Sequence, residues 1–177
     1  MFSNKTTITN TIDLKEKLKE LKDSFDLNVA KPFEQAEKPG EHHIIFTLNN
    51  ELFAWPIAKV KDALINQKII SIPSNVLSLY GVVNYKNQVI SVTNLHYILL
   101  GIRGIESNVK NILLVTKGLA IDTAFFVDGL KGIAPISEYE IKEKPATVST
   151  ETSELIKGIY YYKTQLITIL KYDRFSG

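Results

Sequence analysis

The sequence predicts a mainly β protein in which residues 43–177 form two similar small β units behind an N-terminal amphipathic helix. Two observations carry this prediction. From His43 onward, apolar and polar residues alternate along short segments that end in turn residues, a pattern typical of strands and hairpins. In addition, residues 80–95 resemble residues 157–172, so the same strand–turn–strand unit occurs twice. Two five-stranded barrels fit this pattern.

The composition is that of an ordinary globular protein, because 45% of its 177 residues are apolar and 23% are charged. The 21 basic and 19 acidic side chains are interspersed, so net charge implies no particular partner. The absence of cysteine excludes disulfides, thiolate zinc sites and cysteine nucleophiles. No signal peptide is evident, and no apolar run approaches the roughly 18 residues of a membrane span. We therefore expect a cytoplasmic protein with no direct membrane insertion.

The first 42 residues are expected to form a helix and a linker, separate from the β body. Asp13 is placed to cap a helix that has Glu16 at its third position, and apolar residues then follow at helical spacing. Residues 28–40 contain two prolines and no periodicity, which indicates a linker. A helix this short is marginal alone, so its apolar face is expected to dock on its own domain or on a partner. That face consists of Leu14, Leu18, Leu21 and Phe25.

The body is predicted to open with a hairpin and a short helix. Residues 44–48 form the first strand, and residues 51–57 return as the second. Between them, Asn49 and Asn50 supply a turn that tolerates positive φ. Pro56 suits the first turn of a short helix, which a further strand and turn would follow. The residues sharing one face of this helix would be Ile57, Val60 and Leu64.

A second hairpin is predicted around a turn at Lys86 and Asn87. The chain after it indicates a brief helix, because Thr93 or Asn94 can cap its start and Gly101 its end.

Beyond this helix the pattern begins again with a hairpin, residues 112–128, which turns at Lys117 and Gly118. Residues 137–154 are rich in Ser, Thr, Glu and Lys and read as a long irregular connection. Residues 155–172 close the chain as strand, turn and strand. The second arm of the hairpin is expected to place on one face Leu119, Ile121, Thr123, Phe125 and Val127.

The internal repeat supports a duplicated body. Two unrelated hairpins of similar composition can align equally well by chance, but here the elements on both sides also occur in the same order. Identical residues pair Gly81 with Gly158, Tyr85 with Tyr162, Lys86 with Lys163, Gln88 with Gln165 and Ile90 with Ile167.

The sequence offers no convergent set of catalytic groups. His42 and His43 are adjacent, so on a strand they point to opposite faces, and His96 stands alone. The nine glycines are scattered and form no phosphate-binding loop. Asp122 and Asp128 would lie about 20 Å apart along a strand, too far to act as an acid–base pair. We therefore expect no enzymatic activity, no catalytic residues, no metal site and no cofactor.

Four segments in order resemble the CheW-like adaptor domain of bacterial chemosensory systems, over about residues 43–175. The resemblance implies two SH3-like five-stranded β-barrels packed side by side and no catalytic activity. It also implies two partners, a CheA-type histidine kinase and the cytoplasmic tip of a chemoreceptor. The four segments are FTLNNELFAWPIAKV, GVVNYKNQVISVTNL, the hairpin ending in FFVDGLKGI, and LIKGIYYYKTQLITIL.

The same resemblance implies receptor-facing residues at Val60, Asp62, Gly81 and Lys86. The residues themselves also allow plainer roles. Val60 can face the core, Gly81 can serve close packing, Lys86 can be an ordinary residue at a hairpin tip, and Asp62 is expected to be solvated.

The central motif departs from the family pattern in four places. Where the family usually has Arg, Lys86 keeps the charge but loses the planar fork, which weakens the case for a bidentate contact. The remaining departures are Asn87 for Gly, Ser91 for Pro and Asn94 for Asp, whereas Asn84 and Leu95 keep the pattern.

Two further points stay open at the level of sequence. The N-terminal helix and the segment AWPIAKV resemble the PilI branch of the family more than the CheW of swimming chemotaxis. The PilI branch serves type IV pilus twitching. The competing interpretation is a small basic β-barrel that binds nucleic acid or another polyanion. It draws on a pI of about 8.6 and on the consecutive residues Tyr160, Tyr161 and Tyr162, of which at most two can form one platform.

The linker predicts that residues 1–40 can be deleted without unfolding the body. The truncated chain is expected to melt cooperatively, with a free energy of unfolding close to that of the full chain, as measured by chemical denaturation. A loss of several kcal/mol would contradict the prediction and place the helix face in the main core.

Overall fold

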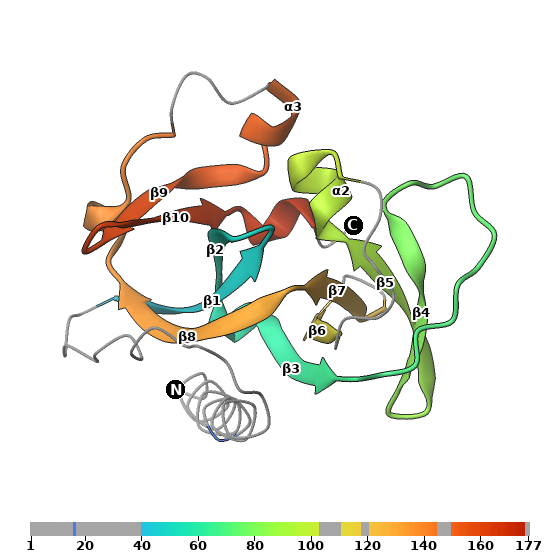
Figure 1. Ribbon diagram of the computed structural model, residues 1–177. Coiled ribbons are helices and arrows are strands. Elements are labelled where there is room, and N and C mark those ends of the chain that lie inside the picture. The colour runs from blue at the N-terminus through green and yellow to red at the C-terminus, as the bar shows by residue number, and fades with distance from the viewer. Residues whose placement is uncertain (1–15, 17–39, 103–110, 118–120, 145–149, 176–177) are drawn as a thin grey trace.

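The computed structural model describes Glu16, which is helical, and residues 40–102, 111–117, 121–144 and 150–175. These residues form two five-stranded sheets, each curved into a small unit (Figure 1). The predicted mainly β fold with two five-stranded units is therefore confirmed. Apart from Glu16, the predicted helix on Leu14, Leu18, Leu21 and Phe25 lies outside the described residues, and so does the linker up to residue 39.

We call the two units the first and the second barrel, with strand orders β8-β1-β2-β10-β9 and β3-β6-β7-β5-β4. The first barrel consists of β1 (Glu41–Leu48), β2 (Glu51–Pro56), β8 (Gly129–Ile136), β9 (Ile156–Tyr162) and β10 (Gln165–Leu170). The second consists of β3 (Val60–Ile65), β4 (Leu79–Tyr85), β5 (Gln88–Asn94), β6 (Ile112–Thr116) and β7 (Thr123–Val127). The helical segments are η1 (Ile57–Lys59), α2 (Leu95–Leu100), η2 (Glu138–Glu140), α3 (Thr150–Ser153) and η3 (Tyr172–Arg174).

Each barrel combines strands from both parts of the duplicated chain. The hairpins β1–β2 and β6–β7 hold equivalent places in the two sheets, as do β4–β5 and β9–β10. However, β3 follows the first hairpin in the chain but pairs with β6 of the second hairpin, and β8 correspondingly pairs with β1. In Figure 1 the cyan β1 and β2 therefore share a sheet with the orange and red β8, β9 and β10. Neither barrel can be completed without strands from the other part of the chain.

The segment that follows each exchanged strand closes its barrel. After β3, Ile70 bridges Val82 of β4 through backbone hydrogen bonds of 2.8 and 2.9 Å. After β8, Lys142 bridges Ile159 of β9 with the same two distances. Each bridge joins the chain beyond one edge strand to the opposite edge strand, so both ends of the sheet are covered.

The two repeated hairpins, β4–β5 and β9–β10, pair in the same register. Gly81 and Gly158 occupy the same place, next to a bulge in their hairpins. A Cβ atom built on Gly81 would lie 2.5 Å from the carbonyl oxygen of Ile70, and one on Gly158 would clash in the same way with the carbonyl of Lys142. Glycine is therefore required at both positions because the closing bridge passes directly over the strand.

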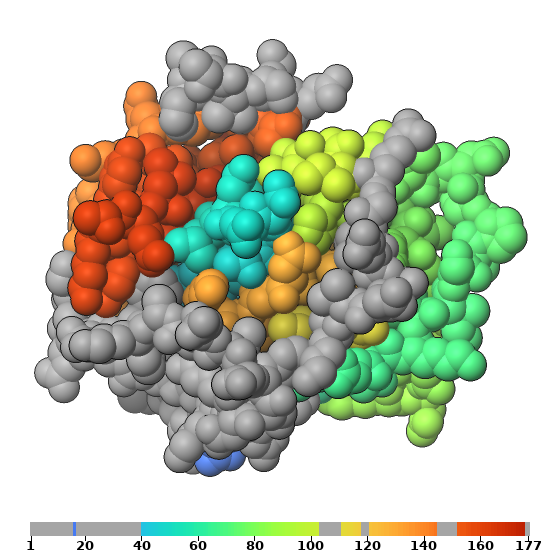
Figure 2. Space-filling model, viewed as in Figure 1, coloured from blue at the N-terminus to red at the C-terminus, as the bar shows by residue number. Residues whose placement is uncertain are grey.

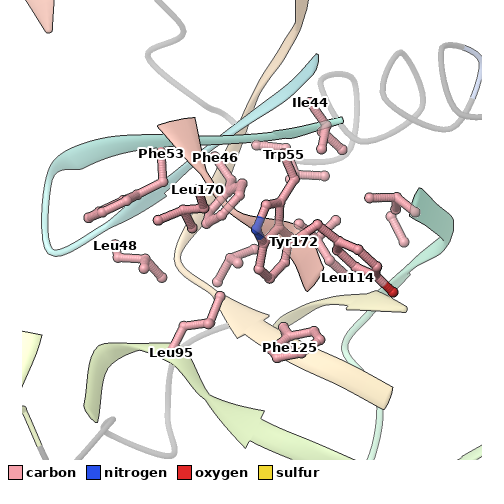
Figure 3. Packing of buried hydrophobic residues seen from close by; sticks show 14 of the residues in the cluster. Ile44, Phe46, Leu48, Phe53, Trp55, Leu95, Leu114, Phe125, Leu170 and Tyr172 are labelled. Atoms are coloured by element: carbon pink, nitrogen blue, oxygen red, sulfur yellow. The ribbon is translucent and has the colours of Figure 1, made fainter. Parts of the chain in front are cut away.

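The largest cluster of buried apolar residues lies between the two barrels and takes residues from both sheets (Figure 3). Trp55 is fully buried within it. Its ring centroid lies 5.0 Å from that of Phe125, 5.2 Å from that of Phe46 and 5.3 Å from that of Phe175. Aromatic pairs at these distances add to the hydrophobic contribution of the core.

Each barrel also has its own smaller core, so β1 and β6 are buried on both faces. Ile44 and Leu114 point into the shared cluster, whereas Ile45 and Leu113 point into the interiors of the first and second barrel. All four side chains are fully buried. This explains why the sequence of these strands is almost continuously apolar.

Polar contacts join the two barrels at equivalent positions of the two sheets. After β5, His96 of α2 places Nε2 2.9 Å from a carboxylate oxygen of Asp128, which in turn accepts from the Asn49 N–H of the β1–β2 turn at 2.6 Å. After β10, the Tyr172 hydroxyl of η3 donates to the carbonyl of Lys117, next to the β6–β7 turn. In each case the segment after one repeated hairpin, β4–β5 or β9–β10, reaches the turn of the β1–β2 or β6–β7 hairpin in the other barrel.

The predicted capping of α2 is confirmed. The Asn94 side chain accepts from the Tyr97 N–H at 3.1 Å, and Gly101 ends the helix with φ 69°.

The helix predicted from Pro56 is wrong beyond its first turn. A single 3-10 turn, η1, leads directly into strand β3. Val60 packs in the shared core whereas Leu64 packs against the core of the second barrel, so the two side chains do not share a face. Pairing with the buried strand β6 overrides the apolar spacing that suggested a helix.

Strand β8 was missed, because the glycines and Pro135 in its sequence indicate a break. Pro135 is tolerated since β8 is the edge strand of its sheet. The second arm of the β6–β7 hairpin begins at Thr123, and Ile121 before it is 65% exposed, so it does not continue the predicted apolar face. Leu119 lies outside the described residues. The predicted irregular connection contains two short helical segments, η2 and α3.

The closing bridges predict that Gly81→Ala and Gly158→Ala each destabilise the fold by about 1–3 kcal/mol, since a methyl group would collide with backbone. Asn84→Ala, at an exposed position of β4, is the matched control and should change stability by less than about 0.5 kcal/mol. Urea denaturation of the three variants measures the effect. If Gly81→Ala and Gly158→Ala are as stable as the control, glycine is not required at these two positions.

The Asp128 contacts predict a pH-dependent contribution to stability. Burial alone would raise the pKa of the Asp128 carboxyl, but the hydrogen bonds from His96 and the Asn49 N–H lower it below its ordinary value. A lowered pKa stabilises the fold above the unfolded value of about 4, and this contribution is lost as the pH falls through the lower folded value. Asp128→Asn should therefore cost about 1 kcal/mol at neutral pH, a low figure because the side chain is 38% exposed.

Denaturant melts at several pH values test this prediction. The difference between wild type and Asp128→Asn should narrow as the pH falls below about 4. The exposed carboxylate Glu143, changed to Gln, provides the control. A constant difference across this range would show that the Asp128 charge contributes nothing.

Candidate functional site

The structure brings two of the four predicted site residues together. Asp62 lies on β3 and Lys86 in the turn between β4 and β5, and the Lys86 Nζ is 4.0 Å from an Asp62 oxygen. Val60 lies at the start of β3 but is only 1% exposed, so it has no surface to offer a partner and acts through the shared core. Gly81 is buried under the closing bridge.

Asp62 is not solvated, contrary to the expectation from sequence. Its residue exposure is 7%, one carboxylate oxygen accepts from the Ala63 N–H at 2.9 Å, and the other lies 3.4 Å from the Tyr85 hydroxyl. The cause is a bulge in the pairing of β3 with β6, in which Lys61 is the extra residue. Lys61 is consequently turned outward, and the side chain after it is buried.

Lys86 is held above this carboxylate by the turn. Lys86 and Asn87 both have positive φ, 48° and 64°, which gives the tight two-residue turn favoured in hairpins. The Lys86 Nζ lies 4.9 Å from the centroid of the Tyr85 ring, and its side chain is 72% exposed. An ion pair so exposed contributes little to stability, which leaves the ammonium group able to contact a partner.

A second ion pair, which the sequence did not reveal, lies beside the first. The Lys61 Nζ is 2.8 and 2.7 Å from the two oxygens of Asp122. These residues come from the bulge of β3 and from the chain just before β7, so nothing in their sequence spacing marked them as neighbours. Both members of this second pair, and Lys86 of the first, border a surface pocket of about 400 Å³, which is lined by Lys61, Tyr85, Lys86, Gln88 and Asp122.

The first barrel repeats part of this arrangement but lacks the carboxylate. Lys163 occupies the equivalent turn with φ 55°, and its Nζ lies 5.4 Å from the centroid of Tyr162. At the place of Asp62, next to the corresponding bulge, the register puts Gly132. The duplicated fold thus provides a cation at both hairpin tips but a buried acidic partner at only one.

An exposed apolar loop projects from the same barrel. The chain between β3 and β4 runs along one edge of the molecule, at the right of Figure 2. It and the neighbouring strand β5 present large apolar side chains to solvent, which is typical of surfaces that contact other proteins. These side chains are Ile70, Ile72, Val76, Leu77 and Val89.

The part of the chain that the structure describes contains no group of three His, Cys, Asp or Glu side chains arranged to hold a metal ion. Among the same residues, no helix has the length and hydropathy needed to cross a bilayer.

Comparisons with known proteins agree with this architecture. Residues 42–176 match the family described as the CheW-like domain. The chain is 26% identical over 129 residues to the chemotaxis protein CheW of Thermotoga maritima, an alignment that covers 73% of this chain and 83% of that protein. It also resembles the crystal structure of the scaffolding protein TtCheW from Thermoanaerobacter tengcongensis, with a TM-score of 0.64 and 25% identity over 75% of this chain and 89% of that one. The chain therefore belongs to the family of CheW-like domains.

Proposed function

We propose that the protein is a non-enzymatic scaffold of chemosensory signalling that couples a chemoreceptor to a CheA-type histidine kinase. The observation that carries the proposal is the pairing of Asp62 with Lys86, because the family resemblance assigns both positions to receptor contact and the exposed Lys86 ammonium lies above the largely buried Asp62 carboxylate. The relatives named above, a chemotaxis protein and a scaffolding protein, support the same role. A scaffold of this kind works in the cytoplasm, where both partners present their binding surfaces.

A scaffold must contact its two partners at the same time, and the second barrel offers two kinds of surface for this. The pocket beside Lys86 is polar and charged, whereas the loop that carries Ile70 and Val76 is apolar. A specific contact commonly buries about 800 Å² on each partner, which a body of this size can supply more than once. We assign the receptor to the charged surface and the kinase to an apolar surface of the same barrel.

The output of the proposed pathway is the control of motility, by swimming or by twitching. The N-terminal amphipathic helix and the segment AWPIAKV favour the PilI branch and twitching. Residues 1–42 would then form a separate helix and linker ahead of the CheW-like domain of residues 43–177.

The alternative, a β-barrel that binds nucleic acid or another polyanion, has less support. Tyr160 is buried in the first barrel, which leaves Tyr161 and Tyr162 as the accessible pair. In addition, the lysines of the pocket are each paired with a carboxylate, so the pocket itself is not an uncompensated basic surface.

Co-purification of the tagged full-length protein from its own cells tests the proposal. Recovery of a CheA-like kinase together with a chemoreceptor is the expected result. Recovery of nucleic acid in place of both would favour the alternative, and the identity of the receptor would separate swimming from twitching.

Lys86→Ala is expected to weaken binding to a receptor cytoplasmic tip by about fivefold, because an exposed cation contributes about 1 kcal/mol or less. Lys86→Arg should keep or strengthen binding, since it restores the planar fork. Lys163→Ala, at the equivalent turn of the first barrel, is the matched control and should bind as wild type does. Affinity is measured by titration and the melting temperature is recorded for each variant. Equal effects of the Lys86 and Lys163 variants would remove Lys86 from the site.

A further inference from the structure

The two ion pairs at the pocket, whose lining includes both lysines and Asp122 but not Asp62, are layered, with the cations more exposed than the carboxylates. The side chains of Lys86 and Lys61 are 72% and 42% exposed, whereas those of Asp62 and Asp122 are only 10% and 15% exposed. The four charges sum to zero, but a molecule that approaches from solvent meets the ammonium groups first. The surface that it meets is therefore cationic.

The carboxylates are also engaged by groups of the protein itself. Both oxygens of Asp122 lie within 2.8 Å of the Lys61 Nζ. One oxygen of Asp62 accepts from the Ala63 N–H, and the other faces the Tyr85 hydroxyl. A cationic ligand would have to displace these contacts, whereas an anionic ligand has only to approach the exposed ammonium groups.

We propose that this pocket binds the carboxylate of an acidic side chain of a protein partner, placed between the ammonium groups of Lys61 and Lys86. The exposed amide of Gln88, which also lines the pocket, supplies a further donor. This inference rests on the proposed function in that it places a partner at Lys86, and it adds Lys61 and Asp122 as residues that determine which partner is accepted.

The charge balance favours a carboxylate over a phosphate. Each lysine is already partly compensated by its own carboxylate, so the pocket suits a group that carries a single negative charge, such as one carboxylate end of a ligand, better than a phosphate group that carries two. A polyanion would also require a continuous basic surface around the pocket.

Titration of the ¹⁵N-labelled full-length protein with glutarate at low ionic strength, followed by NMR, tests the proposal. Backbone signals of residues 61, 86–88 and 122 should shift and saturate in the millimolar range, as expected for a few weak ionic contacts. Glutaramide, which has the same length but no charge, and the dication putrescine should leave these signals unchanged. If the signals saturate with putrescine but not with glutarate, the pocket binds cations and the proposal is wrong.

Substitutions of opposite effect separate binding from loss of structure. Lys61→Met and Lys86→Met should each lower the affinity for glutarate at least threefold. Asp122→Asn should raise it at least threefold, because it releases Lys61 from its carboxylate partner. Lys163→Met in the first barrel is the control and should leave the affinity unchanged. The proposal would be refuted if the control lost as much affinity for glutarate as the pocket variants. It would also be refuted if the NMR shifts grew linearly without saturation, or if inorganic phosphate bound more tightly than glutarate.

The outcome is distinguishable from that of the proposed function. If the chain captures a receptor and a kinase but glutarate does not shift the pocket signals, the carboxylate site is wrong and the scaffold function stands. If glutarate binds as described but neither partner is captured, the pocket stands and the scaffold function falls.

Discussion

The shared aromatic core around Trp55 is the interaction on which the rest of the structure depends. Because β3 pairs with β6 and β8 pairs with β1, neither barrel is complete until both parts of the chain have met. The contacts that form at that meeting include those of Trp55 with Phe125 and Phe175. Burial of large aromatic side chains is among the strongest contributions available to a domain of this size. The exchange of strands therefore makes the two barrels a single cooperative unit.

This arrangement leaves the far edge of each barrel available for other roles. The hairpin β4–β5 lies at the edge of its sheet, and its turn carries Lys86 away from the shared core. The equivalent turn of the first barrel carries Lys163, but there Gly132 stands where the second barrel has Asp62. The two barrels share one strand arrangement, and the difference between Asp62 and Gly132 next to the bulge gives the two hairpin tips different surface chemistry.

The sequence predicted most strands and two residues of the candidate site, Asp62 and Lys86. The pairing of some strands and the second ion pair could not be predicted, for identifiable physical reasons. Alternating apolar residues and the repeat identified the hairpins and the equivalence of Gly81 with Gly158. They could not identify the exchange of β3 and β8, because a hydrophobic pattern states which side chains are buried but not which strand lies beside them. The same limit explains why the expectation of a solvated Asp62 is wrong. A one-residue bulge at Lys61 changes the face of every side chain after it in the strand. No residue type in this segment indicates that a bulge is present.

The layering of charge at Lys86 shows what a lysine offers a partner at the position where the family resemblance implies an arginine. An arginine would offer a planar fork to its partner, whereas Lys86 offers a point charge whose nearest carboxylate is 4.0 Å away and largely buried. The contact of Lys61 with Asp122 places a second ammonium group at the same pocket. Two point charges at separate positions define a direction of approach for an incoming carboxylate, as the two nitrogens of a guanidinium do. The bulge that buries Asp62 also exposes Lys61, so one backbone irregularity creates both halves of this arrangement.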